Sequence, residues 1–346
     1  MSLWAPAFIT AATGAMVALP LAPALIELHR RRDASPLVTR TDDGRIENFA
    51  SSLREYMQPL TQLPPESHGK LLHNLLRDGS SAIVLSQTDV ANLPDAAIDA
   101  AAYAPHSILF PAPVCFLRDL YIRGDLKLAD ESVLRAALVE GNAEFGERSS
   151  VMRWLHVEGN LDAAAEARFF GRTSCTGVVT ISPGCQFERL RGKAIHFGTQ
   201  QWPSSRRSSE WLAPGNTQPR LGRVRSQGDF HLGNSDAFNG HIVAAGSVTI
   251  ADDVLVVGSV KAKANVEIGA RSHVAGTVVS QGRTTIGDQC FLKGPVLSEG
   301  EIIVGPGTEI GSPDSPTTVS APRVRIAAGA KVYGVAWARE SGEVIP

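Results

Sequence analysis

Between residues 222 and 311, apolar and polar positions repeat in five consecutive blocks of 18 residues. Odd positions of each block other than position 13 are small or apolar, and even positions are mostly polar or charged. Every block opens with glycine, and its third residue is β-branched. The eleventh residue is always aliphatic, and these five residues are Leu232, Ile250, Ile268, Ile286 and Val304. A fixed short period of this kind is the sequence signature of a solenoid.

The alternation predicts β-strands with one face directed inward and the other outward. Because the period is even, like residues stack in columns from coil to coil. Three faces of six residues suit a triangular coil, and the glycine or alanine at position 12 suits a sharp corner. Helix is disfavoured because the apolar spacing is two and β-branched residues dominate. We therefore predict an all-β fold, a single-stranded triangular β-helix whose position-11 residues form an internal aliphatic ladder.

The pattern extends in both directions with interruptions. Upstream, glycines at 124, 141, 159 and 177 follow one another at spacings of 17, 18 and 18. We assign one β-helix block to residues 100–198 and a second to 222–340, followed by a tail at 341–346. Residues 199–221 are rich in Pro, Ser and Arg, which predicts a surface loop. About eleven or twelve coils at about 4.8 Å each would make a rod on the order of 50–60 Å long.

Residues 1–32 are predicted to form a membrane anchor. No charged side chain occurs from Met1 to Ile26, and an apolar run of about 22 residues, roughly 33 Å as a helix, can cross a bilayer core. Arg30, Arg31 and Arg32 follow the run, which places the next domain in the cytoplasm. A cleavable signal peptide would carry its positive charge before the run. The alternatives are an interfacial or hairpin segment and a cleaved or soluble one.

Residues 33–99 are predicted to be a helical linker or cap. Apolar residues recur at helical spacing from residue 46 to residue 57, and Pro59 is expected to end this helix. A second short helix is predicted from Ser67 to Gly79. An open coil exposes unpaired strand edges, so we expect these helices to cover the first coil. Docking of a partner is the alternative role.

Composition and motifs point away from catalysis. The net charge is −2, so nothing attracts nucleic acid globally. The chain has no P-loop, no G-x-S-x-G and no H-E-x-x-H motif, and we predict no enzyme activity, cofactor or metal. Three of the four cysteines, Cys175, Cys185 and Cys290, fall at inward positions, where cysteine behaves as a small hydrophobe.

The remaining polar candidates also have simple structural interpretations. Four histidines at outward positions are expected to be solvated: His156, His231, His241 and His273. The pair Asp252–Asp253 follows a position-11 residue, which favours a turn over a metal site, because two carboxylates lack further ligands. Five arginines make the loop and its exit basic: Arg206, Arg207, Arg220, Arg223 and Arg225. They are either solvated or bind an anionic surface or polymer.

The repeats resemble those of the bactofilins, a family of bacterial polymer-forming cytoskeletal proteins. The resemblance rests on runs such as GSVKAKANVEIGARSHVAG and SEGEIIVGPGTEIG and is strongest over residues 222–311. It implies a right-handed triangular β-helix that self-assembles without nucleotide. It also implies attachment to the inner face of the cytoplasmic membrane and recruitment of envelope or polysaccharide-synthesis proteins. The rod here is about twice the family's usual length, with long inserts and its own N-terminal segment.

Two other classes stay open. Hexapeptide-repeat acyltransferases also use 18-residue triangular coils, but their aliphatic-Gly unit would occur on all three faces, and here it occurs on one. A carbohydrate-binding or adhesive β-helix would need an exported rod. For the scaffold, the short C-terminal coil lacks a helical lid, so we predict self-association through Tyr333, Val335 and Trp337. A rod with one open end would form a two-fold dimer.

Overall fold

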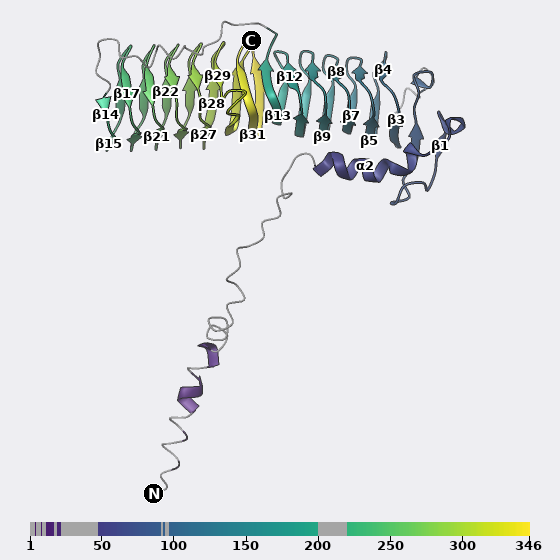
Figure 1. The fold of residues 1–346 in the computed structure, drawn as a ribbon, viewed down its shortest axis with the longest axis horizontal. Coiled ribbons are helices and arrows are strands. Elements are labelled where there is room, and N and C mark those ends of the chain that lie inside the picture. Colours follow the sequence, from purple (N-terminus) through teal and green to yellow (C-terminus); the bar gives the residue numbers. More distant parts are fainter. Residues whose placement is uncertain are drawn as a thin grey trace. The chain divides into compact units, whose positions relative to one another are not determined.

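The computed structural model describes residues 48–90, 93, 97–199 and 220–346, together with residues 4, 8, 12–16 and 19–21 near the start of the chain. Its main body is a β-solenoid of about 13 turns, and the described strands all belong to one hydrogen-bonded system (Figure 1). The predicted all-β solenoid is therefore confirmed.

The second block is built from three columns of short parallel strands. The first column holds β15 (Val224–Ser226), β18 (Ile242–Ala244), β21 (Val260–Ala262), β24 (Val278–Ser280) and β27 (Val296–Ser298). The second holds β16 (Phe230–Leu232), β19 (Val248–Ile250), β22 (Val266–Ile268), β25 (Thr284–Ile286) and β28 (Glu301–Val304). The third holds β14 (Arg220–Leu221), β17 (Ala237–Asn239), β20 (Leu255–Val257), β23 (His273–Val274), β26 (Phe291–Leu292) and β29 (Glu309–Ile310). Strands β30 (Thr317–Ala327) and β31 (Lys331–Ile345) run across corners and complete the block.

The position-11 ladder lies inside this block as predicted. Each of its residues pairs with the next along the rod, as Ile250 does with Ile268 and Ile268 with Ile286. All five side chains are at most 3 % exposed. Burying an aliphatic side chain of this size stabilises a fold by about 1.5–3 kcal/mol, so the ladder is a main source of stability.

The corners are made by position 14 rather than by position 12. Five successive position-14 residues have left-handed backbone with φ between 53° and 69°: Ser235, Asp253, Arg271, Gln289 and Gly307. Position 12 is small for another reason. A Cβ on Gly269 would lie 2.6 Å from the carbonyl carbon of Ala251 in the preceding coil. Close stacking therefore selects small residues at position 12, and the turn itself falls two residues later.

The first block alternates short strands with longer ones that bend across a corner. The short strands are β4 (Ile108–Phe110), β6 (Leu126–Leu128), β8 (Ala143–Phe145), β10 (Leu161–Ala163) and β12 (Val178–Ile181). The longer strands are β5 (Cys115–Ile122), β7 (Val133–Val139), β9 (Ser150–Val157), β11 (Arg168–Cys175) and β13 (Gln186–Phe197), and the four-residue β3 (Ala101–Ala104) pairs with β5. The register shifts where the longer strands bend, as between Leu134 and Ala136.

The two blocks meet through their last coils. Strand β13, which ends the first block, pairs antiparallel with β31, which ends the second. The pairing covers all three faces, from Gln186 opposite Glu343 to His196 opposite Lys331. Figure 1 shows the consequence: teal β13 and yellow β31 lie side by side in the middle of the rod, and β14 and β15 lie at one end.

This arrangement corrects two predictions about the C-terminus. The last coil was expected to be an open end, but it is covered by β13 within the same chain. Residues 341–346 were expected to be a tail, but β31 continues to Ile345 and pairs with β30. The inward residues of both last coils are apolar, so the two coils can pack against each other and bury their edges.

The N-terminal end of the rod is covered by a hairpin. Strands β1 (Leu71–Leu72) and β2 (Ala82–Val84) pair antiparallel, and β2 pairs in parallel with β3. The second predicted helix, over residues 67–79, is therefore wrong. A short 3₁₀ turn, η1 (Pro65–Ser67), precedes the hairpin. The second edge of β2, which β3 leaves free, offers backbone partners that outweigh the helical pattern of this segment.

The first predicted helix is confirmed as α2 (Asn48–Thr61), with Pro59 inside it rather than at its end. It lies along the side of the rod and not over its end, because its buried residues share a cluster with Tyr103, Tyr121 and Leu138 from successive coils. Of the predicted anchor at 1–32, only residues 4, 8, 12–16 and 19–21 are described, and its basic flank of Arg30, Arg31 and Arg32 lies outside the described residues. Within the described part of the chain, no helix has the length and apolar character to span a membrane.

Candidate functional site

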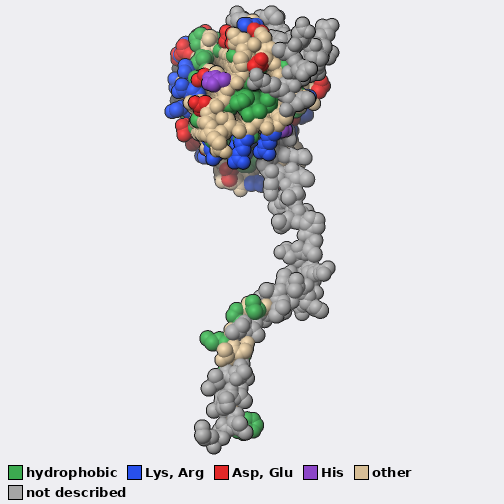
Figure 2. All heavy atoms as spheres, turned by 90° about the vertical axis from the view of Figure 1, so that its left-hand side faces the viewer, with side chains coloured by type: hydrophobic (Ala, Val, Ile, Leu, Met, Phe, Trp, Pro, Cys, Tyr) green, Lys and Arg blue, Asp and Glu red, His purple; other side chains and the backbone are tan. Residues whose placement is uncertain are grey.

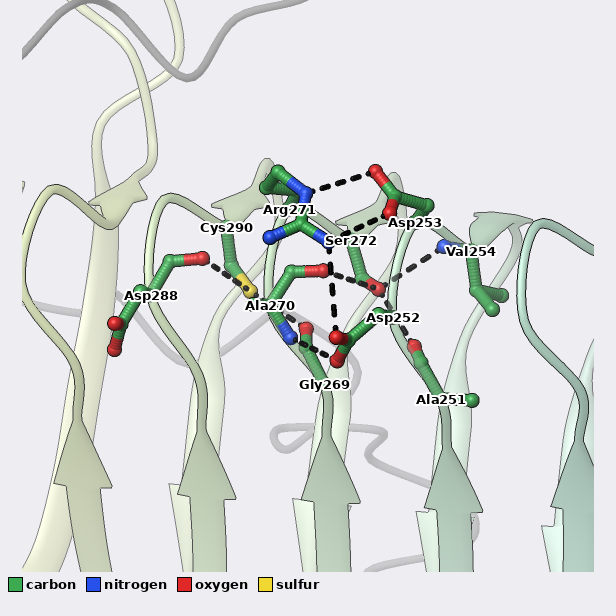
Figure 3. Close-up of polar contacts among 10 residues, drawn as sticks. All are labelled: Ala251, Asp252, Asp253, Val254, Gly269, Ala270, Arg271, Ser272, Asp288 and Cys290. Carbon is green, nitrogen blue, oxygen red and sulfur yellow. Dashed lines mark hydrogen bonds and ion pairs between the residues drawn. The ribbon is translucent and has the colours of Figure 1, made fainter.

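The acidic pair Asp252–Asp253 lies at a corner of the coil (Figure 3). Asp253 has φ 60°, and its two carboxylate oxygens accept hydrogen bonds from Arg271 Nε at 3.1 Å and Nη2 at 2.8 Å. Asp252 Oδ1 accepts a hydrogen bond from the backbone N–H of Ala270 at 2.8 Å. Both carboxylates therefore connect one coil to the next, in agreement with the predicted turn.

The same corner contains a buried serine and a buried thiol. Ser272 Oγ donates to the carbonyl of Ala251 at 2.9 Å and accepts from the N–H of Val254 at 3.1 Å. Cys290 Sγ lies 3.1 Å from the carbonyl oxygen of Gly269, and burial raises the pKa of this thiol to about 11. A thiol that stays protonated at neutral pH is a poor nucleophile and metal ligand.

The other inward cysteines behave in the same way. Cys175 and Cys185 are buried, and burial raises the pKa of each thiol to about 11. Their predicted role as small core residues is confirmed. Across the described residues, no three His, Cys, Asp or Glu side chains are grouped so that they could hold a metal ion.

One of the four outward histidines departs from its predicted environment. His156 is only 5 % exposed, and its Nδ1 lies 2.7 Å from Ser174 Oγ. It sits on β9, which α2 contacts, so an outward position is here covered by the helix. His231 and His241 are exposed, and His241 Nδ1 accepts a hydrogen bond from the N–H of Ser259 at 3.1 Å. His273 packs edge-on against Phe291.

The predicted basic patch is placed only in part. Arg206 and Arg207 lie outside the described residues, and of Arg220 only the backbone is described. Arg223 and Arg225 are exposed on the coil that contains β15. The two arginines are therefore at the outer end of the rod.

That outer end is formed by β14, β15 and β16. Among the described strands, each of the three pairs only with the following coil. Val224 and Phe230 donate their N–H groups to the carbonyls of His241 and Ser247 in the following coil. The neighbouring residues on these strands therefore direct their N–H groups along the rod axis, away from the following coil. Val224 and Phe230 are only partly buried, and Figure 2, which looks onto this end, shows hydrophobic side chains at its surface.

A second feature was not anticipated from the sequence. Four outward residues on adjacent rungs form a line across the block junction: Trp154, Arg172, Arg189 and Trp337. The guanidinium carbon of Arg172 is 4.9 Å from the Trp154 ring centroid, and that of Arg189 is 5.0 Å from the Trp337 ring centroid. The 18-residue spacing from Trp154 to Arg172 follows the repeat, but Trp337 joins the line only through the antiparallel junction.

The three predicted self-association residues lie beside this line. Val335 pairs with Arg191 and Trp337 with Arg189, both on β13, and Tyr333 precedes them on β31. Their backbone edge is thus already used within the chain. Self-association through these residues was predicted from an open last coil, and that premise is wrong.

Comparisons of the chain with protein-family models, with curated proteins and with solved structures found no significant match.

Proposed function

We propose that this protein is a structural scaffold whose rod self-associates through the end formed by β14, β15 and β16. The observation that carries the proposal is the contrast between the two ends. The β1–β2 hairpin pairs with the first coil, whereas the outer edges of β14, β15 and β16 have no partner among the described strands. Unpaired edges on a regular sheet are templates for another strand.

The block junction supports this mode of association. Strands β13 and β31 join two terminal coils of the same kind of solenoid, antiparallel and over three faces. A second copy can meet the outer coil in the same antiparallel sense. Because the first coil at the other end is paired with the β1–β2 hairpin, association through β14, β15 and β16 gives a closed two-fold dimer and not a filament. Burial of Val224 and Phe230 would add a hydrophobic contribution.

The cellular setting of the scaffold follows from the sequence. The uncharged N-terminal run followed by Arg30, Arg31 and Arg32 supports a rod held at the inner face of the cytoplasmic membrane. The bactofilin-like repeats support a role in organising envelope or polysaccharide-synthesis proteins. An alkaline phosphatase that is active only after export, fused after Pro346, should therefore be inactive. High activity would contradict the cytoplasmic orientation.

The association is tested by analytical ultracentrifugation of the full-length protein in density-matched detergent. We expect a dimer for the wild type and a monomer for Phe230→Arg. Arg225→Pro, which removes an N–H from the unpaired edge of β15, should also give a monomer. Trp337→Arg is the matched control, because Trp337 lies on the side of the rod, and it should remain a dimer. A monomeric wild type would exclude self-association, and micrometre filaments would show that the hairpin opens.

A further inference from the structure

Two columns of outward side chains run along the face on which α2 packs, and they continue across the block junction. One column is formed by Trp154, Arg172, Arg189, Trp337, Ser320 and Leu297, in that order. The other is formed by Leu138, His156, Ser174, Arg191, Val335 and Thr318. The antiparallel register of β13 and β31 joins the columns of the two blocks without a step. The face is therefore one surface and not two.

Helix α2 shows how this surface binds a helix. Phe49 stacks on Trp154 with ring centroids 5.5 Å apart. Leu53 and Met57 are buried in a cluster with residues of successive coils. Arg54 Nε donates to Glu140 Oε1 at 3.1 Å, and Arg54 also pairs with Glu158. A 14-residue helix is about 21 Å long, which matches four to five rungs at about 4.8 Å.

Beyond Trp154 the charge of the surface is reversed. Arg172 and Arg189 occupy adjacent rungs, and across the described residues neither has an ion-pair partner. Burial, and then the neighbouring Arg172 and Arg191, lower the pKa of Arg189. Its Nε is buried and has no hydrogen-bond acceptor within the described part of the chain. Two like charges side by side, without an ion-pair partner among the described residues, favour the arrival of carboxylates.

The apolar part of the same stretch is exposed. Trp337 is 39 % exposed and Leu297 is 37 % exposed. They lie two rungs apart, about 10 Å, which equals the separation of residues i and i+7 on one face of a helix. A strand cannot dock here by backbone pairing, because these rungs are hydrogen-bonded on both sides. The spacing and the charge together select a helix.

We propose that the stretch formed by Arg172, Arg189, Trp337 and Leu297, here called the junction patch, docks an acidic amphipathic helix of a partner protein in line with α2. Apolar side chains of that helix cover Trp337 and Leu297, and its carboxylates bind the two guanidinium groups. This docking deepens the proposed scaffold function. The recruitment of a partner by the junction patch rests on that function. It uses the side of the rod, whereas self-association uses the end.

Two peptides that differ in the sign of the charge at one residue provide the probe. Both carry the α2 sequence from Asn48 to Thr61 with Ser51→Lys, linked by a lactam to Glu55 so that the short helix is preformed. Ser51 and Glu55 are exposed in α2, so the lactam leaves the binding face intact. One peptide keeps Arg54, and the other carries Arg54→Glu. Fluorescence anisotropy measures the Kd of each labelled peptide for the full-length protein.

We expect the Arg54→Glu peptide to bind about tenfold more tightly than its Arg54 counterpart, as for charge pairs across an interface. Protein carrying Arg172→Gln and Arg189→Gln should lose this preference, and Arg283→Gln, on another face, should keep it. Equal Kd values, or no binding by either peptide, would overturn the proposal. So would phosphatidylglycerol vesicles that bind the wild type but not the double variant, because the occupant would then be a lipid surface. The double variant should sediment as the wild type does, which separates this test from that of self-association.

Discussion

Arg189 on β13 lies opposite Trp337 on β31, with its guanidinium over the indole ring at 5.0 Å, although the two strands are the last of different repeat blocks. The pair lies at the block junction, here called the seam, where β13 and β31 pair and the direction in which the coils are stacked reverses. Coils of the first block progress toward this seam from one end of the rod, and coils of the second block progress toward it from the other end (Figure 1). The last coils of the two blocks therefore pair with each other at the seam. The first coil of the second block lies at one end of the rod.

The first prediction concerns the internal ladder. Ile268 is 3 % exposed and stacks between Ile250 and Ile286, so Ile268→Asp would bury a carboxylate without a partner. We expect a loss of more than about 3 kcal/mol in the free energy of unfolding. Glu267→Asp, on the adjacent exposed position, should change it by less than about 0.5 kcal/mol. Thermal unfolding of both variants measures the difference, and equal midpoints would contradict the inward assignment.

The second prediction concerns the corner at position 14. Gln289 has φ 53°, which costs a residue with a Cβ about 1 kcal/mol relative to glycine. Gln289→Gly should therefore raise the free energy of unfolding by about 0.5–1 kcal/mol, and Gln289→Val should lower it. Gly307, with φ 69° one coil later, provides the converse change, because Gly307→Ala should be destabilising. Denaturant unfolding decides the signs; a destabilising Gln289→Gly would mean that its side chain supports the corner.

The repeat predicts inward and outward residues well because these depend only on local alternation. The 18-residue period therefore identified the ladder through Ile268 and the columns that flank it. The period carries no information on the direction in which a block is stacked. At the seam, Leu190 meets Ala336, and two small or aliphatic inward residues fit equally well in parallel and antiparallel pairs. The line from Arg172 to Trp337 could not be found for the same reason.

The N-terminal segment shows a second limit of sequence patterns. Residues 67–79 have apolar spacing that suits a helix, yet Leu71 and Leu72 pair with β2 in a hairpin. The competing interaction is the free edge of β2, whose other edge pairs with β3, and no local pattern reports it. In α2 the periodicity was decisive, because Leu53, Met57 and Leu60 need only a flat apolar surface and find one on the side of the rod.

The third prediction concerns pH. Burial raises the pKa of the Cys290 thiol from 9.0 to about 11, so between these values the unfolded chain loses a proton that the folded chain keeps. Stability from this group is complete below pH 9 and is lost as pH rises toward 11, by about 2–3 kcal/mol. Cys290→Ala should flatten the decline of stability over this range. A decline identical to that of the wild type would contradict the shift.

The same thiols can be tested by their reactivity. At pH 8, Cys175, Cys185 and Cys290 are buried and protonated, so an aromatic disulfide reagent should leave them unmodified in the folded protein. Cys115 is partly exposed and provides the internal comparison. Mass spectrometry of the modified protein should locate the label at Cys115 alone, and rapid labelling of Cys290 would show that the corner opens.

The last prediction concerns the seam itself. A protease site inserted between residues 199 and 220 would cut the covalent link between the blocks while leaving the pairing of β13 with β31 intact. We expect the two fragments to remain together in size-exclusion chromatography, because the seam pairs backbone over three faces and buries residues such as Phe187 and Ala336. A Cβ at position 342 would lie 2.6 Å from a ring carbon of Phe187, so Gly342→Leu should weaken the seam. In the cut protein this variant should separate into two fragments, whereas Glu340→Ala, exposed on the same strand, should not. Separation of the cut wild type would show that the two blocks are held together only by the chain.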